Sequence, residues 1–174
     1  MKHTVQPTGD IPDAIIIGGG PVGSYAALNL AKLGVKVTVF EEHPEIGLPS
    51  HCAGHLSIRS LSTMGLYPLP DGIVENTFSS ANFYSPAGTK FSLHLSRPVT
   101  ATLNRARFDQ YLAGQAEVAG ARFVLNTRVQ SLIISDGYVK GVNIQRNGAK
   151  EEKAYSKITM DAEGISSRLL RQAV

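Results

Sequence analysis

A run of glycines after a short apolar segment constrains the fold of this chain more than any other feature. Residues 13–17 read Asp-Ala-Ile-Ile-Ile, and three glycines follow at 18–20. A continuous apolar run of this length is typical of a strand buried on both faces, as in a parallel sheet. After Pro21, apolar positions over 25–33 recur with helical spacing, and residues 35–40 return to strand character. The sequence therefore predicts one βαβ unit.

The glycine turn satisfies the GxGxxG pattern, and its context indicates a dinucleotide site. Gly18 permits a sharp turn, Gly20 lets the backbone approach a pyrophosphate, and Gly23 lets the helix pack closely on the strand. Glu41 ends the second strand, where a carboxylate can accept hydrogen bonds from ribose hydroxyls. The alternative is a tight turn with a solvated Glu41, but strand, helix, second strand and acidic residue agree in register. The cofactor-binding residues predicted here are Gly18, Gly20, Pro21, Val22, Gly23 and Glu41, with Glu42 as the fallback if the register is displaced by one.

Composition favours a soluble globular protein. The chain has 174 residues, of which 43% are hydrophobic, and its net charge of +3 comes from Lys and Arg residues that form no long run. A nucleic-acid-binding face is therefore disfavoured. Cys52 is the single cysteine, so a reducing, cytoplasmic location is the simpler expectation. The first ten residues carry no apolar signal segment, and no stretch is apolar enough to span a bilayer, so any membrane contact is expected to be peripheral.

The rest of the chain shows weaker patterns. Residues 41–56 predict a loop, and 58–66 a short helix. Two strands around a turn at Ser85–Gly88 are expected within 78–103, as a sheet excursion. Asn104 is expected to cap a helix that ends at Gly120. A small β-meander is predicted from strands over 122–125, 129–134, 139–144 and 153–160, with tight turns at Asp136-Gly137 and Asn147-Gly148.

Three later motifs carry a resemblance to a known family. Residues 47–54 read GLPSHCAG, residues 105–109 read RARFD, and residues 161–167 read DAEGISS. With the glycine turn, they make the chain similar to the FAD-dependent geranylgeranyl reductase family, within a larger flavoprotein group that includes aromatic-ring hydroxylases. The resemblance runs from about residue 13 to the end of the chain. It implies that the dinucleotide is FAD.

The first motif has the form G-x-P-x-x-C-x-G, and the resemblance implies that it lies near the isoalloxazine ring. Cys52 is then the candidate catalytic residue, which would tune the ring or donate a proton, with the pKa of its thiol shifted by His51 and His55. Ala53 and Gly54 are expected beside the cofactor. A small buried apolar role for Cys52 is the alternative. A metal site at His51, Cys52 and His55 is disfavoured because it offers too few ligands, so no metal is expected.

The other two motifs imply further FAD contacts. The resemblance implies that Arg105 reaches the cofactor, where a guanidinium neutralises pyrophosphate charge, whereas Asp109 is expected to be structural. Glu163 stands where most of the group has aspartate, and is expected to accept a ribityl hydroxyl bond. Gly164 is expected to give close backbone approach at a helix start. Val129 corresponds to a position that clamps adenine through backbone atoms.

The expected fold is α/β, a Rossmann-like three-layer domain with a β-meander, plus the first strands of an incomplete substrate domain. The FAD-binding domain is expected over 11–174, with 75–103 as an excursion. The chain ends shortly after Gly164, which predicts a fragment that lacks most of the substrate domain and is inactive alone. The resemblance implies reduction of isoprenoid lipid double bonds with electrons from NAD(P)H or ferredoxin. The alternatives are an aromatic-type monooxygenase and a non-catalytic dinucleotide-binding fragment.

Overall fold

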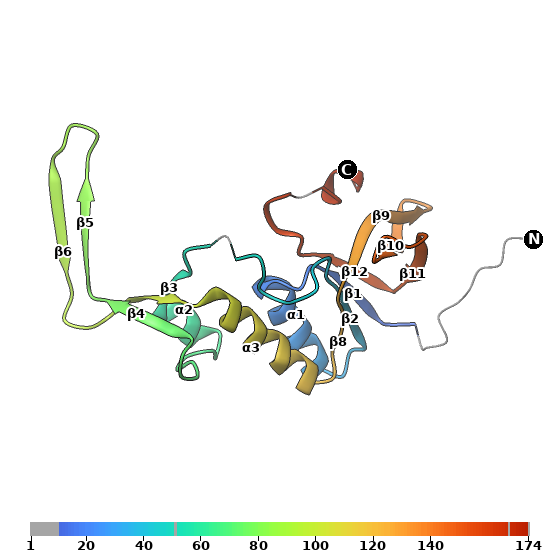
Figure 1. The fold of residues 1–174 in the computed structure, drawn as a ribbon, viewed down its shortest axis with the longest axis horizontal. Coiled ribbons are helices and arrows are strands. Elements are labelled where there is room, and N and C mark those ends of the chain that lie inside the picture. The colour runs from blue at the N-terminus through green and yellow to red at the C-terminus, as the bar shows by residue number, and fades with distance from the viewer. Residues whose placement is uncertain (1–10, 51, 167, 174) are drawn as a thin grey trace, which may run out of the picture. The chain divides into compact units, whose positions relative to one another are not determined.

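The computed structural model describes residues 11–50, 52–166 and 168–173, which divide into two compact units (Figure 1). The first unit runs up to Ile46 and resumes at Tyr111, and the second holds Gly47–Gln110. The boundary at residue 110 falls within the helix α3 (Arg105–Val118).

The first unit is built on a parallel four-stranded sheet in the order β12-β1-β2-β8. Its strands are β1 (Ala14–Ile17), β2 (Val37–Phe40), β8 (Arg122–Val124) and β12 (Ile158–Asp161). All four residues of β1 are buried, and the helix α1 (Pro21–Lys32) connects β1 to β2. The predicted βαβ unit is confirmed. Because the strands are parallel, the segments that follow them emerge at one edge of the sheet.

The two faces of this sheet are covered by different layers. On one face, Ile16 belongs to a core cluster with Ala27 and Leu28 of α1, and Ala116 of α3 joins them. On the other face, Ile15 packs in a cluster with strands of a β-meander. Helix, parallel sheet and meander therefore form three layers, and the predicted fold class is confirmed. Neighbouring isoleucines on opposite faces explain why β1 reads as an unbroken apolar run.

The meander consists of β9 (Thr127–Ser135), β10 (Tyr138–Arg146) and β11 (Glu152–Tyr155), in the order β11-β10-β9. The turn between the first two strands has positive φ at Asp136 (54°) and Gly137 (76°), as a two-residue hairpin of type I′ requires. This predicted turn is confirmed.

Two segments that were predicted to be meander strands pair instead, in whole or in part, with the parallel sheet. The single strand expected over 153–160 is two strands, β11 in the meander and β12 in the parallel sheet. Ser156 lies between them, buried, and its hydroxyl donates to the carbonyl of Ile158 at 2.8 Å. The strand predicted at 122–125 is β8, which also pairs in the parallel sheet. Strand propensity gives no information about which sheet a strand joins.

The second unit contains more strands than predicted. Four strands cross residues 74–103 in place of two, and a short strand begins inside the predicted loop at His55. The turn at Ser85–Gly88 is confirmed, with the amide of Gly88 donating to the carbonyl of Ser85 at 2.9 Å. An antiparallel sheet of order β3-β7-β4 and a separate pair β5-β6 are made from β3 (His55–Ser57), β4 (Val74–Phe78), β5 (Ser80–Tyr84), β6 (Lys90–His94) and β7 (Thr100–Leu103).

The helices outside α1 follow local capping signals. The helix α2 (Ile58–Thr63) is capped by the Ser57 hydroxyl and ends before the predicted Leu66. At the start of α3, the side-chain oxygen of Asn104 accepts a hydrogen bond from the amide of Arg107 at 3.1 Å, so the predicted cap is confirmed. Neither α3 nor any other described helix has the length and apolar character that a membrane crossing requires.

Candidate functional site

The glycine turn lies at the carboxyl edge of the parallel sheet and is packed without spare room at two positions. Gly18 follows β1 with φ of +99°, and a Cβ there would lie 2.5 Å from the carbonyl oxygen of Ala162, beyond β12. A Cβ at Gly23 would overlap the carbonyl oxygen of Gly18. The buried Ser24 hydroxyl closes the turn by donating to the carbonyl of Gly19 at 2.9 Å. The turn therefore depends on two glycines for protein packing alone.

Gly20 is different, because its surroundings are open. It is the N-cap residue of α1, with an ordinary φ of −66°, and a Cβ there would meet no atom within 4 Å. No side chain caps the helix, and Pro21 follows with no amide hydrogen to donate. The side chain of Val22 is 72% exposed. This helix end presents backbone amides and a positive dipole to an open space, which suits a phosphate-bearing ligand.

Glu41 is fixed against the glycine turn. It follows β2, and its Oε2 accepts a hydrogen bond from the amide of Gly19 at 2.7 Å. Its Oε1 accepts from the backbone amide of His43 at 3.0 Å and lies 2.6 Å from His43 Nδ1. His43 was not anticipated from the sequence, and the only signal for it was its spacing of two residues from Glu41. The carboxylate is thus oriented on the same edge of the sheet as the glycine turn.

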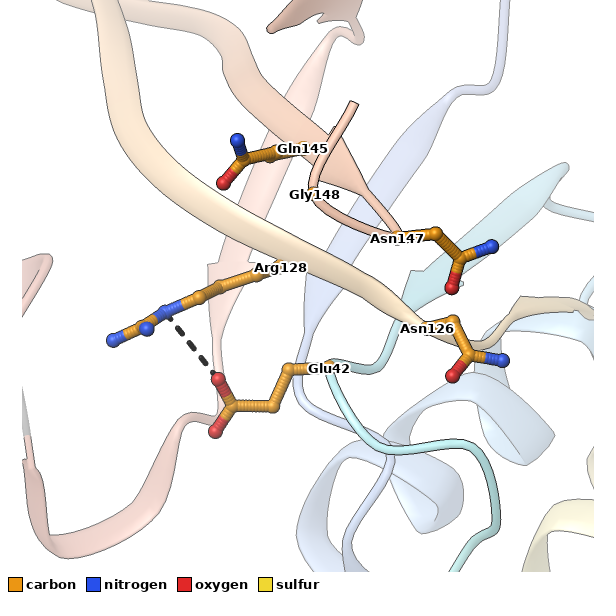
Figure 2. Close-up of a pocket in the computed structure, with 6 residues that line it drawn as sticks. All are labelled: Glu42, Asn126, Arg128, Gln145, Asn147 and Gly148. Atoms are coloured by element: carbon orange, nitrogen blue, oxygen red, sulfur yellow. Dashed lines mark ion pairs between the residues drawn. The ribbon is translucent and has the colours of Figure 1, made fainter. Parts of the chain in front are cut away.

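A polar pocket of about 290 Å³ lies beside the start of β9 and the end of β10, next to Glu42 (Figure 2). Figure 2 shows Glu42 and Arg128 pointing toward each other, with 3.4 Å between Oε2 and Nε. Both side chains are about half exposed, so this pair adds little stability. Glu42 is therefore engaged with Arg128, whereas Glu41 engages the glycine turn. The pocket is lined by Glu42, Asn126, Arg128, Gln145, Asn147 and Gly148.

The segment after β12 is held by contacts that the sequence did not reveal. The carbonyl of buried Val129 accepts a hydrogen bond from Arg168 Nη2 at 2.6 Å. Glu163 Oε1 accepts from the amide of Leu169 at 2.6 Å, so this carboxylate holds the following turn. Gly164 has φ of +78° and begins a 3₁₀ turn (Gly164–Ser166) rather than the expected helix. The FAD contacts expected of Val129, Glu163 and Gly164 stay predictions, and Ser167 of this motif lies outside the described residues.

In the second unit, Gly47 and Gly54 of the GLPSHCAG motif lie close to the start of α3, Gly47 beside Ala106 and Gly54 beside Arg105. Gly54 is buried with φ of +68°, and its carbonyl accepts from the amide of Leu103 at 2.9 Å. Cys52 Sγ lies 3.5 Å from the Gly54 amide that donates to it, and Ala53 is exposed. The Cys52 side chain is also exposed, so the alternative of a buried apolar role is wrong.

Arg105 and Asp109 form a bidentate ion pair on the first turn of α3. Arg105 Nε lies 3.1 Å from Oδ1 and Nη2 lies 3.0 Å from Oδ2, and the two side chains are 17% and 7% exposed. Burial raises the pKa of the Asp109 carboxyl, against the opposing effect of the Arg105 guanidinium. The hydrogen bond to Asp109 in turn raises the pKa of Arg105. In this structure the Arg105 guanidinium is therefore occupied by Asp109, and its contact with a cofactor stays a prediction.

The histidines of this region have other partners. His55 Nε2 lies 2.8 Å from the hydroxyl oxygen of Thr100, and its ring meets Phe78 edge-on. His51 lies outside the described residues. Among the residues that are described, no three His, Cys, Asp or Glu side chains gather into a metal site.

The predicted site residues therefore form two groups, one in each unit. The first unit brings together the glycine turn, Glu41 and the segment at Glu163. The second brings together Cys52 and Arg105.

Sequence comparison finds a protein family and curated relatives. A family model described as an FAD binding domain matches residues 12–174. Digeranylgeranylglycerophospholipid reductase 1 of Methanopyrus kandleri is 34% identical over 162 residues, which are 92% of this chain and 42% of the relative. Digeranylgeranylglycerophospholipid reductase of Methanosarcina acetivorans is 35% identical over 167 residues, which are 94% of this chain and 40% of the relative. The chain thus spans about two fifths of the length of these relatives.

Solved structures of a reductase-like protein and of an FAD-dependent halogenase are also similar to this chain. A geranylgeranyl bacteriochlorophyll reductase-like protein of Thermoplasma acidophilum matches with a TM-score of 0.86 and 30% identity, over 94% of this chain and 42% of that one. A myxobacterial chondrochloren halogenase, a variant of FAD-dependent halogenases, matches with a TM-score of 0.78 and 25% identity, over 95% of this chain and 40% of that one. The resemblance inferred from the motifs is confirmed.

Proposed function

This chain belongs to the FAD binding domain family, and we propose that it is the FAD-binding part of an oxidoreductase that reduces double bonds of isoprenoid lipids. FAD as the predicted cofactor is confirmed by the family match. The observation that carries the proposed activity is the similarity, over more than nine tenths of the chain, to two digeranylgeranylglycerophospholipid reductases. The GLPSHCAG motif supports the reductase over a hydroxylase, which has no evident use for Cys52.

The residues of the first unit fit the nucleotide half of FAD. The open space at Gly20 and the uncapped start of α1 suit the pyrophosphate, and the oriented Glu41 carboxylate suits the adenosine ribose. Val129 is proposed to contact adenine through its backbone. Glu163 and Gly164 are proposed to face the ribityl chain. Bound FAD would accept a hydride from a donor and deliver reducing equivalents to an alkene.

The second unit is proposed to serve the flavin half. Cys52, Ala53 and Gly54 would then lie near the isoalloxazine ring, and Arg105 near the phosphates. This assignment follows the family resemblance of the GLPSHCAG and RARFD motifs.

The proposed substrate is an apolar isoprenoid lipid, because both curated relatives are named for such a lipid. The electron donor is proposed to be NAD(P)H or ferredoxin. A lipid substrate must be taken from a membrane, so we propose a cytoplasmic protein with peripheral membrane contact.

The first experiment is an absorbance spectrum of the purified chain after addition of FAD. A bound flavin spectrum is expected, and its absence would contradict the cofactor assignment.

The flavin would then be reduced without oxygen and mixed with an unsaturated isoprenoid glycerophospholipid in detergent. Reoxidation with loss of lipid double bonds supports the reductase. Oxygen consumption with an aromatic substrate would support the monooxygenase alternative. Bound FAD without turnover would support a non-catalytic module.

Replacing Glu41 with alanine is expected to weaken FAD binding by roughly tenfold to a hundredfold, as expected for loss of a hydrogen-bond acceptor that is charged. The matched control is Glu42→Ala, which removes the neighbouring carboxylate and breaks the half-exposed pair with Arg128. Its effect on FAD affinity is expected to stay within about twofold. Titration of flavin fluorescence measures both affinities. Equal losses in the two variants, or a loss only in Glu42→Ala, would show that the register of the acidic residue is wrong.

A further inference from the structure

The carboxylate of Glu41 is held by hydrogen-bond donors on both of its oxygens. Oε2 accepts the backbone amide of Gly19 at 2.7 Å. Oε1 accepts the backbone amide of His43 at 3.0 Å and lies 2.6 Å from Nδ1 of the same residue. Because a carboxylate only accepts hydrogen bonds, the ring nitrogen of His43 is the donor in this contact. Oε1 therefore has two donors, whereas Oε2 has one.

This arrangement leaves the carboxylate one acceptor site for a ligand. An ionised carboxylate offers about four such sites, two on each oxygen. Among the described residues, the donors of His43 fill both sites on Oε1, and the amide of Gly19 fills one site on Oε2. The side chain of Glu41 is 12% exposed, so the last site can be reached. It belongs to the oxygen that contacts Gly19, the residue before the open position at Gly20.

The backbone fixes the His43 ring and the Glu41 carboxylate at this separation. The amide of Glu41 donates to the carbonyl of Val124 at 3.1 Å, and its carbonyl accepts the amide of Thr127 at 2.8 Å. The carbonyl of His43 accepts the amide of Asn126 at 3.1 Å. Both residues are thus tied to the same segment between β8 and β9. The ring therefore stays beside Oε1 without a ligand.

We propose that His43 is a positioning residue that leaves Glu41 one open acceptor, so that the carboxylate binds one hydroxyl of the adenosine ribose rather than both. This role rests on the proposed function, which places the ribose at Glu41. Without the His43 ring, one acceptor site would be open on each oxygen, which suits the two adjacent hydroxyls of a ribose. The ring removes that possibility because it fills the second site on Oε1.

The test compares the affinity of the chain for FAD with its affinity for two FAD analogues. One analogue lacks the 2′ hydroxyl of the adenosine ribose, and the other lacks the 3′ hydroxyl. One of the two is expected to bind about tenfold or more weakly than FAD, because it loses a hydrogen bond to a charged acceptor, and the other to bind within about threefold of FAD. Titration of flavin fluorescence measures all three affinities.

Variants of His43 connect this pattern to the ring. His43→Ala removes the ring but keeps the backbone amide, so both analogues are expected to bind that variant about tenfold or more weakly than FAD does. His43→Asn places a side-chain amide where it can donate as Nδ1 does, and is expected to restore the loss to one analogue. The matched control Glu42→Ala removes the neighbouring carboxylate, keeps His43, and should show the pattern of the unchanged chain.

The ratio of two affinities in one variant separates positioning from a merely structural role. A general loss of stability or affinity would weaken all three ligands alike and leave the ratios unchanged. Equal losses for both analogues in the unchanged chain, or unchanged ratios in a folded His43→Ala variant, would overturn the inference. If His43→Ala does not fold, the two analogues still decide in the unchanged chain.

Failure of the proposed function gives different results. A chain that does not bind FAD would contradict the proposed function, and the role of His43 would fall with it. If FAD binds but neither analogue is weaker than FAD, the ribose does not lie at Glu41, which refutes the role of His43 and leaves the cofactor standing. Weaker binding of both analogues to the unchanged chain would refute the role of His43 alone.

Discussion

Replacing Gly20 with valine is expected to abolish FAD binding while changing the free energy of unfolding by no more than about 1 kcal/mol. A Cβ at this position meets no protein atom within 4 Å, and φ is −66°, which any residue adopts. The stability cost is therefore limited to a poorer N-cap residue. In the proposed complex, however, the space beside Gly20 is the space of the pyrophosphate. Flavin fluorescence gives the affinity, and urea denaturation gives the stability.

Two other variants of the same turn make this prediction specific. Gly20→Ala adds one methyl group and is expected to weaken FAD binding less than Gly20→Val does. Val22→Ala shortens a side chain that is 72% exposed but keeps the backbone amide, so FAD affinity should be retained. If Gly20→Val binds FAD as the unchanged chain does, the pyrophosphate does not lie at this helix start, and the family match would need another binding geometry.

The βαβ unit could be predicted because each of its signals is local. Ile15 and Ile16 are fully buried on opposite faces of the parallel sheet, so the sequence of this strand is an unbroken apolar run. Gly18 and Gly23 are required by contacts within the turn and its neighbouring strands. Glu41 lies at a characteristic sequence spacing from Gly18, because one helix and one strand of ordinary length separate the two residues. Sequence spacing therefore carries the geometry of this part of the candidate site.

The parts that could not be predicted depend on distant partners. Residues 153–160 were predicted as one strand, yet β11 and β12 join different sheets. Arg168 bonds the carbonyls of Val129 and Gln130, and a side chain that binds backbone oxygens leaves no residue-type pattern at the acceptor. Asp109 was expected to be structural, and it forms the ion pair with Arg105 four residues before it. The sequence shows this spacing but not the burial of the Asp109 side chain.

Variants of Gly20 and Gly23 distinguish an effect on ligand binding from an effect on folding. The space beside Gly20 is open in the protein by itself, so a side chain at position 20 would clash only with a bound ligand. The space beside Gly23 is filled by the carbonyl of Gly18, so a side chain at position 23 would clash with the protein itself. Loss of FAD binding in a Gly23 variant would therefore say little about the cofactor, whereas the same loss at Gly20 would locate it.

Replacing Gly23 with alanine is accordingly expected to destabilise the chain by about 1–3 kcal/mol, the usual cost of overpacking. Alanine in a helix normally gains about 0.5–1 kcal/mol over glycine, so the expected sign is the reverse of the helix propensity. Gly114 in α3 is the matched control, because a Cβ there meets nothing within 4 Å. Gly114→Ala should therefore stabilise the chain by about 0.5–1 kcal/mol. Urea denaturation of both variants measures the pair. Opposite signs would show that close packing of α1 on the turn after β1 requires glycine at position 23, whereas a gain in both would mean that the turn can relax and that this glycine is kept for another reason.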